Sequence, residues 1–187
     1  MFRLKHTLIA TLLLAVAMIV PSTANAGLIG TTVTLDYHFL STTTVDTFTV
    51  TGGVDITCPG PYNVCSLLTA PVQTITVGDN TITYTFTGCC SSFSNATPNG
   101  FDFENLNLGM PVTGISLSTN LVGLNLSRVT FSANSVQLDM HGIQTPGPVD
   151  YFVVTLNPTA TPEPSSLALF GSGVIGLLGV VRRKLRG

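Results

Sequence analysis

Thr81–Thr87 reads TITYTFT and alternates strictly between threonine and an apolar or aromatic residue. In an extended chain Ile82, Tyr84 and Phe86 would share one face and the threonines the other, because successive side chains of a β-strand point to opposite faces. Thr31–Phe39 repeats this alternation, with Val33, Leu35, Tyr37 and Phe39 on one face and Thr32, Thr34, Asp36 and His38 on the other. Both stretches are predicted to be half-buried strands.

Shorter stretches with the same character follow at close spacing. They are 45–51, 54–57, 73–77, 112–118, 128–132, 135–140 and 151–156, separated by predicted turns at Gly52-Gly53, Gly78-Asp79-Asn80, Asn99-Gly100 and Pro146-Gly147-Pro148. Alanine, the best helix former, is scarce between the two ends of the chain. We therefore expect an all-β domain, a jelly-roll-like β-sandwich of about eight or nine strands.

The first 26 residues have the three parts of a secretory signal peptide. Arg3 and Lys5 form a positive start, Thr7–Val20 is apolar, and Ala24-Asn25-Ala26 supplies the small residues that a signal peptidase accepts. We expect export by a Sec-type signal and cleavage between Ala26 and Gly27. An uncleaved anchor helix is the alternative.

The last 26 residues form a second apolar segment. Pro162-Glu163-Pro164 precedes the apolar run Leu167–Val181, which is followed by Arg182, Arg183, Lys184 and Arg186. Fifteen helical residues span about 22 Å, which is short for a hydrocarbon core of about 30 Å but sufficient with snorkelling arginines. The positive-inside rule would hold the basic end in the cytoplasm. The chain thus divides into a signal peptide (1–26), an ectodomain (27–161) and a tail (162–187).

This tail resembles the PEP-CTERM sorting signal of Gram-negative bacteria, because a Pro-Glu-Pro motif, a short Gly/Leu-rich helix and an Arg cluster occur in that order. The resemblance implies recognition by an exosortase, a membrane transpeptidase, with Pro162, Glu163 and Pro164 marking the processing site. It also implies transient membrane anchoring and delivery to the envelope surface or the exopolysaccharide matrix. Tails of this type are also called ice-binding protein C-terminal domains, a label that describes the tail alone. A permanent single-pass anchor is the alternative.

The stretch after Asn99 is similar to a segment of other PEP-CTERM secreted proteins, in which an NGF-x-F start leads to an S-R-V-x-F-x-A strand. The resemblance implies no activity. We expect its apolar residues to lie in the core: Phe101, Phe103, Leu106, Ile115, Leu117, Val129, Phe131 and Val136.

Charge excludes one class of partner. Between Gly27 and Thr161 the only cation is Arg128, against eight carboxylates, which gives a net charge of −7. Nucleic-acid binding needs clustered Lys and Arg, so we expect none. A single arginine in an acidic domain predicts an ion pair, with Asp102, Glu104 or Asp139 as the candidate partners. A ligand-binding arginine is the alternative.

All four cysteines, Cys58, Cys65, Cys89 and Cys90, lie in the exported part, which predicts two disulfides. Adjacent cysteines rarely bond each other, so Cys89 and Cys90 are each expected to reach back to Cys58 or Cys65 in an order that the sequence does not fix. A four-thiolate zinc site fits the spacing poorly.

Candidate catalytic groups are few. The domain holds His38 and His141 but no nucleophile elbow, zinc-binding histidine pair or phosphate loop. Asp102 and Glu104 would share a strand face, whereas the paired carboxylates of a glycoside hydrolase flank a sugar across a cleft, and the chain has no tryptophan for a sugar platform. A weak Ca²⁺ site with Asp55 or Asp139 is the milder alternative. We expect no enzyme, no cofactor and no metal.

Threonine ladders suggest a different surface. Three ladders place threonine hydroxyls about 6.6–7 Å apart on one face of a strand. They are Thr47, Thr49 and Thr51; Thr74 and Thr76; and Thr81, Thr83, Thr85 and Thr87. Such arrays occur on ice-binding surfaces, although threonine is also an ordinary solvent-facing strand residue. We expect a structural or interaction protein of the envelope or biofilm matrix. A ligand-binding surface protein, for glycan, Ca²⁺ or ice, is the alternative.

Overall fold

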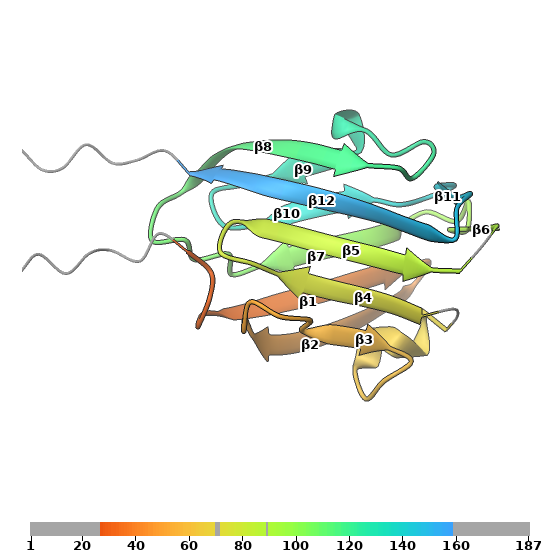
Figure 1. Cartoon of the computed structure of the whole chain (residues 1–187), viewed down its shortest axis with the longest axis horizontal. Helices are drawn as coiled ribbons and strands as arrows, with labels where there is room; N and C mark the ends of the chain where they lie inside the picture. Colours follow the sequence, from red (N-terminus) through yellow and green to blue (C-terminus); the bar gives the residue numbers. More distant parts are fainter. Residues whose placement is uncertain (1–26, 70–71, 89, 159–187) are drawn as a thin grey trace, which may run out of the picture.

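The structure is a computed structural model in which residues 27–69, 72–88 and 90–158 are described. The described chain is built almost entirely of antiparallel strands (Figure 1), so the prediction of an all-β domain is confirmed. The expected signal peptide, Met1–Ala26, and the tail from residue 162, including the apolar run 167–181, lie outside the described residues.

Ten of the strands form two five-stranded sheets. The first, called the β1 sheet, has the order β2 (Thr42–Thr49), β1 (Thr32–Phe39), β7 (Asn99–Glu104), β10 (Val136–Asp139), β9 (Val129–Phe131). The second, the β5 sheet, has the order β3 (Ile56–Cys58), β4 (Val72–Val77), β5 (Thr81–Thr87), β12 (Val149–Pro158), β8 (Val112–Thr119). A small ladder joins β6 (Ser91–Ser92) to β11 (Gln144–Thr145), and two 3-10 turns lie at η1 (Asn63–Ser66) and η2 (Leu126–Arg128).

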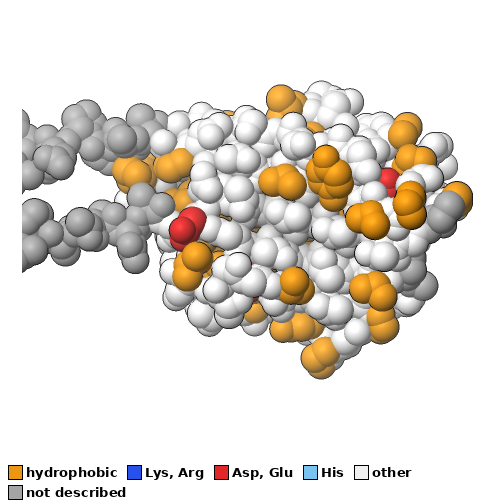
Figure 2. Space-filling model, viewed as in Figure 1, with side chains coloured by type: hydrophobic (Ala, Val, Ile, Leu, Met, Phe, Trp, Pro, Cys, Tyr) orange, Lys and Arg blue, Asp and Glu red, His pale blue; other side chains and the backbone are white. Residues whose placement is uncertain are grey.

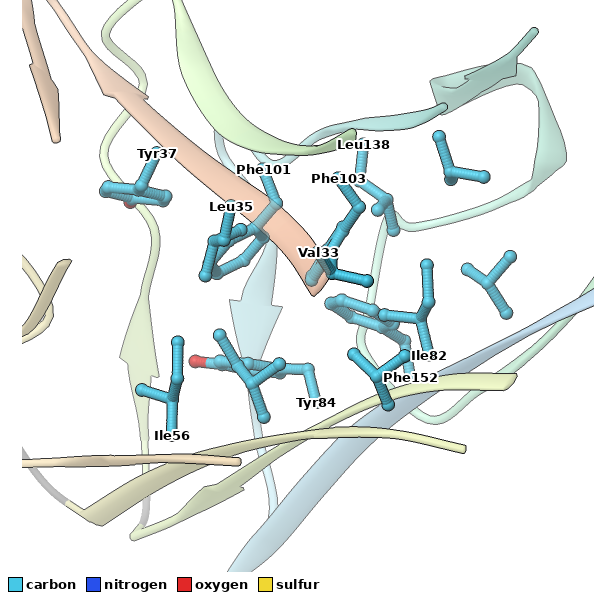
Figure 3. Packing of buried hydrophobic residues seen from close by; sticks show 14 of the residues in the cluster. Val33, Leu35, Tyr37, Ile56, Ile82, Tyr84, Phe101, Phe103, Leu138 and Phe152 are labelled. Carbon is cyan, nitrogen blue, oxygen red and sulfur yellow. The ribbon is translucent and has the colours of Figure 1, made fainter. Parts of the chain in front are cut away.

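The apolar faces of the two sheets meet in one core. Tyr84 of β5 lies with its ring centroid 5.4 Å from that of Phe101 of β7, and 5.2 Å from Phe152 of β12. Figure 3 shows these rings between the strands of the opposed sheets. The alternation that predicted β5 also predicted which of its faces is buried, since Ile82, Tyr84 and Phe86 all lie in the core.

Two details of the expected pattern are wrong. Asn99-Gly100 is not a turn but the start of β7, and a Cβ on Gly100 would collide with the backbone oxygen of Leu138 in β10. This glycine therefore permits a close approach of two strands. Phe131, expected in the core, is 43% exposed, because it ends the three-residue edge strand β9.

The other predicted core residues lie inside or against the core. Phe101, Phe103, Leu106, Val129 and Val136 are buried, and Ile115 and Leu117 of the edge strand β8 pack partly against them.

Both ends of the described domain are tied to one turn. The backbone N–H of Leu28 donates to the carbonyl of Asp79 at 2.8 Å, and that of Leu156 donates to the carbonyl of Asn80 at 2.7 Å. In Figure 1 the first and last described residues of the domain lie on the same side, and β6 and β11 lie at the opposite end.

Candidate functional site

The outer face of the β5 sheet is rich in hydroxyl groups, which are interrupted by the exposed side chains of Val72, Val149 and Tyr151, and we call it the threonine face. It consists of Thr57 on β3, Thr74 and Thr76 on β4, Thr81, Thr83 and Thr85 on β5, Thr155 on β12, and Ser116 and Ser118 on β8. Threonine lies opposite threonine across the strands, Thr74 beside Thr85 and Thr76 beside Thr83. Figure 2 shows this face with no Lys or Arg side chain and with carboxylates only near its margins.

The predicted ladders are therefore divided between the sheets. Thr47 and Thr49 lie on β2, in the β1 sheet, and Thr51 lies beyond the end of that strand. The ladders of β4 and β5 are neighbours because the Gly78–Asn80 turn sets their register. The sequence of each strand shows its own threonine ladder, but it does not show which ladders lie side by side in the sheet.

The outer face of the β1 sheet gathers the carboxylates. Asp36 of β1 lies opposite Asp102 of β7, and Glu104 follows two residues along the same face. Burial, with a further contribution from Glu104, raises the pKa of Asp102 above its ordinary value. Neither Asp102 nor Glu104 lines either of the two hollows described below.

Arg128 is paired as the charge pattern predicted, and Asp139 is its partner among the three candidates. The Nη1 group lies 3.4 Å from Oδ2 of Asp139 and donates to the carbonyl oxygen of His141 at 2.8 Å. The His141 ring Nδ1 lies 2.8 Å from both carboxylate oxygens of Asp139. Burial acts to raise the pKa of Asp139, but hydrogen bonds from His141 and the charge of Arg128 together hold it below its ordinary value.

A shallow hollow of about 260 Å³ adjoins this network. His38, Gly100, Gln137, Arg128 and Asp139 line it. Because Asp139 already neutralises Arg128 at its edge, this hollow offers an incoming anion little net attraction.

A second hollow, of about 310 Å³, opens between the two sheets at the end of the domain that carries β6 and β11, and we call it the end hollow. Its apolar walls come from Tyr37, Phe39, Leu67, Leu68, Phe86 and Phe93, and its polar groups from Ser66, Thr69, Gln73, Ser91, Ser92, Ser94, Asn99 and Thr145. None of these lining residues is charged. The pattern from which the strands were predicted did not reveal this site, because its residues come from seven separated segments.

The described ranges hold no cluster of three or more His, Cys, Asp or Glu side chains placed to share an ion. Asp55, a candidate for Ca²⁺, instead accepts hydrogen bonds from the backbone N–H groups of Val77 at 2.7 Å and Thr51 at 3.2 Å. It fastens the loop before β3 to the end of β4.

The cysteines pair differently from the prediction. Cys58 is bonded to Cys65, with their Cα atoms 5.1 Å apart, so the expectation that Cys89 and Cys90 reach back to them is wrong. The loop after β3 and the η1 turn return the chain to Cys58 within seven residues, which brings Cys65 to it. Cys90 is itself disulfide-bonded, and Cys89 lies outside the described residues.

Comparison with known proteins locates the clearest functional signal outside the described domain. The PEP-CTERM protein-sorting motif matches residues 160–184, which confirms the resemblance drawn from the tail. This motif implies exosortase-dependent sorting of an exported protein, with passage through the membrane to the envelope. No curated protein and no solved structure matches the chain.

The processing and anchoring residues named from the sequence fall in regions that the structure leaves undescribed. They are Ala24 and Ala26 at the signal cleavage site, and Pro162, Glu163, Pro164, Arg182, Arg183, Lys184 and Arg186 in the tail. Gly27, on the mature side of the expected cleavage, begins the described domain. Within residues 27–69, 72–88 and 90–158, no helix has the length and apolar character needed to cross a membrane.

Proposed function

We propose that this protein is a non-catalytic interaction or structural protein of the cell envelope or its exopolysaccharide matrix. The single observation that carries the proposal is the sorting motif at residues 160–184, directly after the last strand of an all-β domain. In this proposal Met1–Ala26 is removed as a Sec-type signal. The segment 167–181 then anchors the chain until an exosortase cuts near Pro162–Pro164.

The domain surface supports a role in a hydrated matrix. The threonine face presents neutral hydroxyl groups across all five strands of the β5 sheet, and Figure 2 shows few charges interrupting it. Neutral hydroxyls exchange hydrogen bonds with water and sugar without the desolvation cost of a charge. We further infer that the two facing sheets form a β-sandwich of jelly-roll type.

The test is the intact mass of the protein recovered from the envelope and medium of its host. The proposal requires a species that begins at Gly27, ends near residues 162–164 and lacks four thiol hydrogens. Replacing Pro162-Glu163-Pro164 with three alanines should leave the tail in place and hold the protein in the inner membrane. Replacing three residues of the domain surface, Thr74, Thr76 and Thr83, with alanine is the matched control and should leave processing unchanged. A tail retained on the unaltered protein would contradict exosortase processing and make residues 167–181 a permanent anchor.

A ligand-binding role is the second candidate, and the in-register threonines of β4 and β5 favour examining it. Ice binding predicts thermal hysteresis that Thr76→Glu and Thr83→Glu abolish together, since charges would break the array. A Ca²⁺ role predicts heat on calorimetric titration. Silence in both assays favours the structural role or recognition of a glycan.

A further inference from the structure

We infer that the end hollow is a binding site for one neutral, hydroxyl-bearing ring, such as a pyranose unit. This deepens the glycan-binding candidate of the proposed function.

Gln73 is the residue that points to a ligand. The residue is 5% exposed, and its Oε1 accepts a hydrogen bond of 2.6 Å from the Tyr84 hydroxyl. The Nε2 group carries two N–H donors, and within the described parts of the chain no side chain or carbonyl accepts from it. The Nε2 atom is not one of the side-chain atoms that are fully enclosed by the protein without a hydrogen-bond partner. Because Gln73 lines the end hollow, its buried amide offers hydrogen-bond donors that a ligand in the hollow would satisfy.

Asn99 provides a second fixed group on the opposite sheet. It is 2% exposed, its Oδ1 accepts from the Tyr37 hydroxyl at 2.7 Å, and its Nδ2 donates to the carbonyl of Ser94 at 2.9 Å. One N–H of this amide and a lone pair of the Tyr37 oxygen remain for a ligand. Both amides are held by tyrosine hydroxyls, so their orientation is set before anything binds.

The residues that line the end hollow indicate the chemical class of the ligand. Phe39 and Phe93 are partly buried and line the hollow together with buried Phe86, so aromatic rings form part of its wall. None of the described lining residues is charged, and the domain as a whole is acidic, so an anion gains no attraction and a cation finds no partner. Two amides, several serines and aromatic surface suit a ring with polar edges and an apolar face. The volume of about 310 Å³ is at the small end of ligand sites and fits a single ring.

The test uses the full-length protein in detergent micelles and equilibrium dialysis against labelled methyl glycosides of glucose, galactose, mannose and N-acetylglucosamine. Saturable binding of at least one of them is expected, with methyl glucuronate bound at least tenfold more weakly. Ser92→Trp should fill the hollow from an exposed lining position and weaken binding at least tenfold. Ser118→Trp, at an exposed position on β8, is the matched control and should stay within twofold of the unaltered protein.

Gln73→Glu tests the proposed donor directly. Glutamate keeps an oxygen for Tyr84 but removes the amide donors, so neutral glycosides should bind at least fivefold more weakly at pH 7 while the fold persists. Binding unchanged by both Ser92→Trp and Gln73→Glu would overturn the site, as would glucuronate binding equal to that of the neutral glycosides or no saturable binding of any glycoside. Binding of oligosaccharides that end in the bound sugar would distinguish recognition of a glycan chain end from recognition of a free monosaccharide. None of these results depends on where the protein is sorted, so failure of this site and failure of the proposed localisation are distinguishable.

Discussion

Asp46 and Val64 join an edge strand of one sheet to the turn that follows an edge strand of the other. The carboxylate Oδ2 of Asp46, on β2, accepts the backbone N–H of Val64 in η1 at 2.7 Å, and its Oδ1 accepts that of Asn63 at 2.8 Å. Asp46 is 7% exposed, and Val64 is fully buried. One side chain thereby satisfies two backbone donors that no strand could reach.

Asp46→Ala is expected to lower the free energy of unfolding by about 3 kcal/mol, because two hydrogen bonds to a charged acceptor are lost and two donors are left without partners. Asp46→Asn, which keeps one acceptor oxygen, should lose about half as much. Urea denaturation measures both, with Thr47→Ala at the neighbouring exposed position as the control. A loss below about 0.5 kcal/mol for Asp46→Ala would mean that water replaces the carboxylate without cost.

Removal of the Cys58–Cys65 disulfide should lower the free energy of unfolding by about 2 kcal/mol. The effect is modest because this disulfide closes a loop with a sequence separation of only seven residues. The measurement compares Cys58→Ser/Cys65→Ser with the unaltered protein in urea. Mass spectrometry of a non-reduced digest should yield a peptide pair linked between Cys58 and Cys65. Recovery of either cysteine linked to Cys90 would contradict this pairing.

Gly100→Ala should destabilise the domain by about 3 kcal/mol, because its Cβ would meet the Leu138 carbonyl in the adjacent strand and force β7 away from β10. Gly53→Ala is the matched control. Its nearest neighbour to an added Cβ is the Thr51 hydroxyl at 3.7 Å, an ordinary contact, so the change should be within about 0.5 kcal/mol. Equal effects at the two positions would show that the close approach at Gly100 relaxes freely.

Two carboxylates of the β1 sheet should respond to pH with opposite signs. A carboxyl group whose pKa is raised on folding destabilises the folded state above that pKa, and the penalty disappears below the pKa of the unfolded chain. Asp102→Asn should therefore raise the urea midpoint at pH 7 and leave it unchanged near pH 3, because burial and Glu104 raise the pKa of Asp102.

Asp139 should show the reverse, because its pKa lies below the ordinary value of 3.8. The stability that this carboxylate provides is present above that value and is lost as the pH falls through the folded-state pKa. Asp139→Asn should lower the urea midpoint at pH 7 and converge with the unaltered protein in strong acid. Shifts of the same sign for Asp102→Asn and Asp139→Asn would contradict the assignment of either group.

Local pattern predicted nine of the strands but not β6, β7 or β11, and it did not predict the sites. The alternation around Tyr84 predicted β5 at its observed bounds and the face that it buries, since side-chain period is a property of a single strand. The prediction of a turn at Asn99-Gly100 is wrong because glycine occurs both in turns and in close strand contacts, and only the position of Leu138 distinguishes the two. The end hollow depends on Gln73 and Asn99 meeting across two sheets, a relationship that no local spacing contains.

The positions of the chain ends give the domain a direction. Leu28 and Leu156 are fastened to the same Asp79–Asn80 turn, whereas the end hollow opens beside β6 and β11 at the opposite end (Figure 1). A domain held to a surface through the residues that follow Pro158 therefore points its hollow away from that surface. Copies attached side by side would all present their hollows outward. The number of copies per unit of surface, rather than the affinity of a single hollow, would then set the avidity of the layer for a repeating polymer.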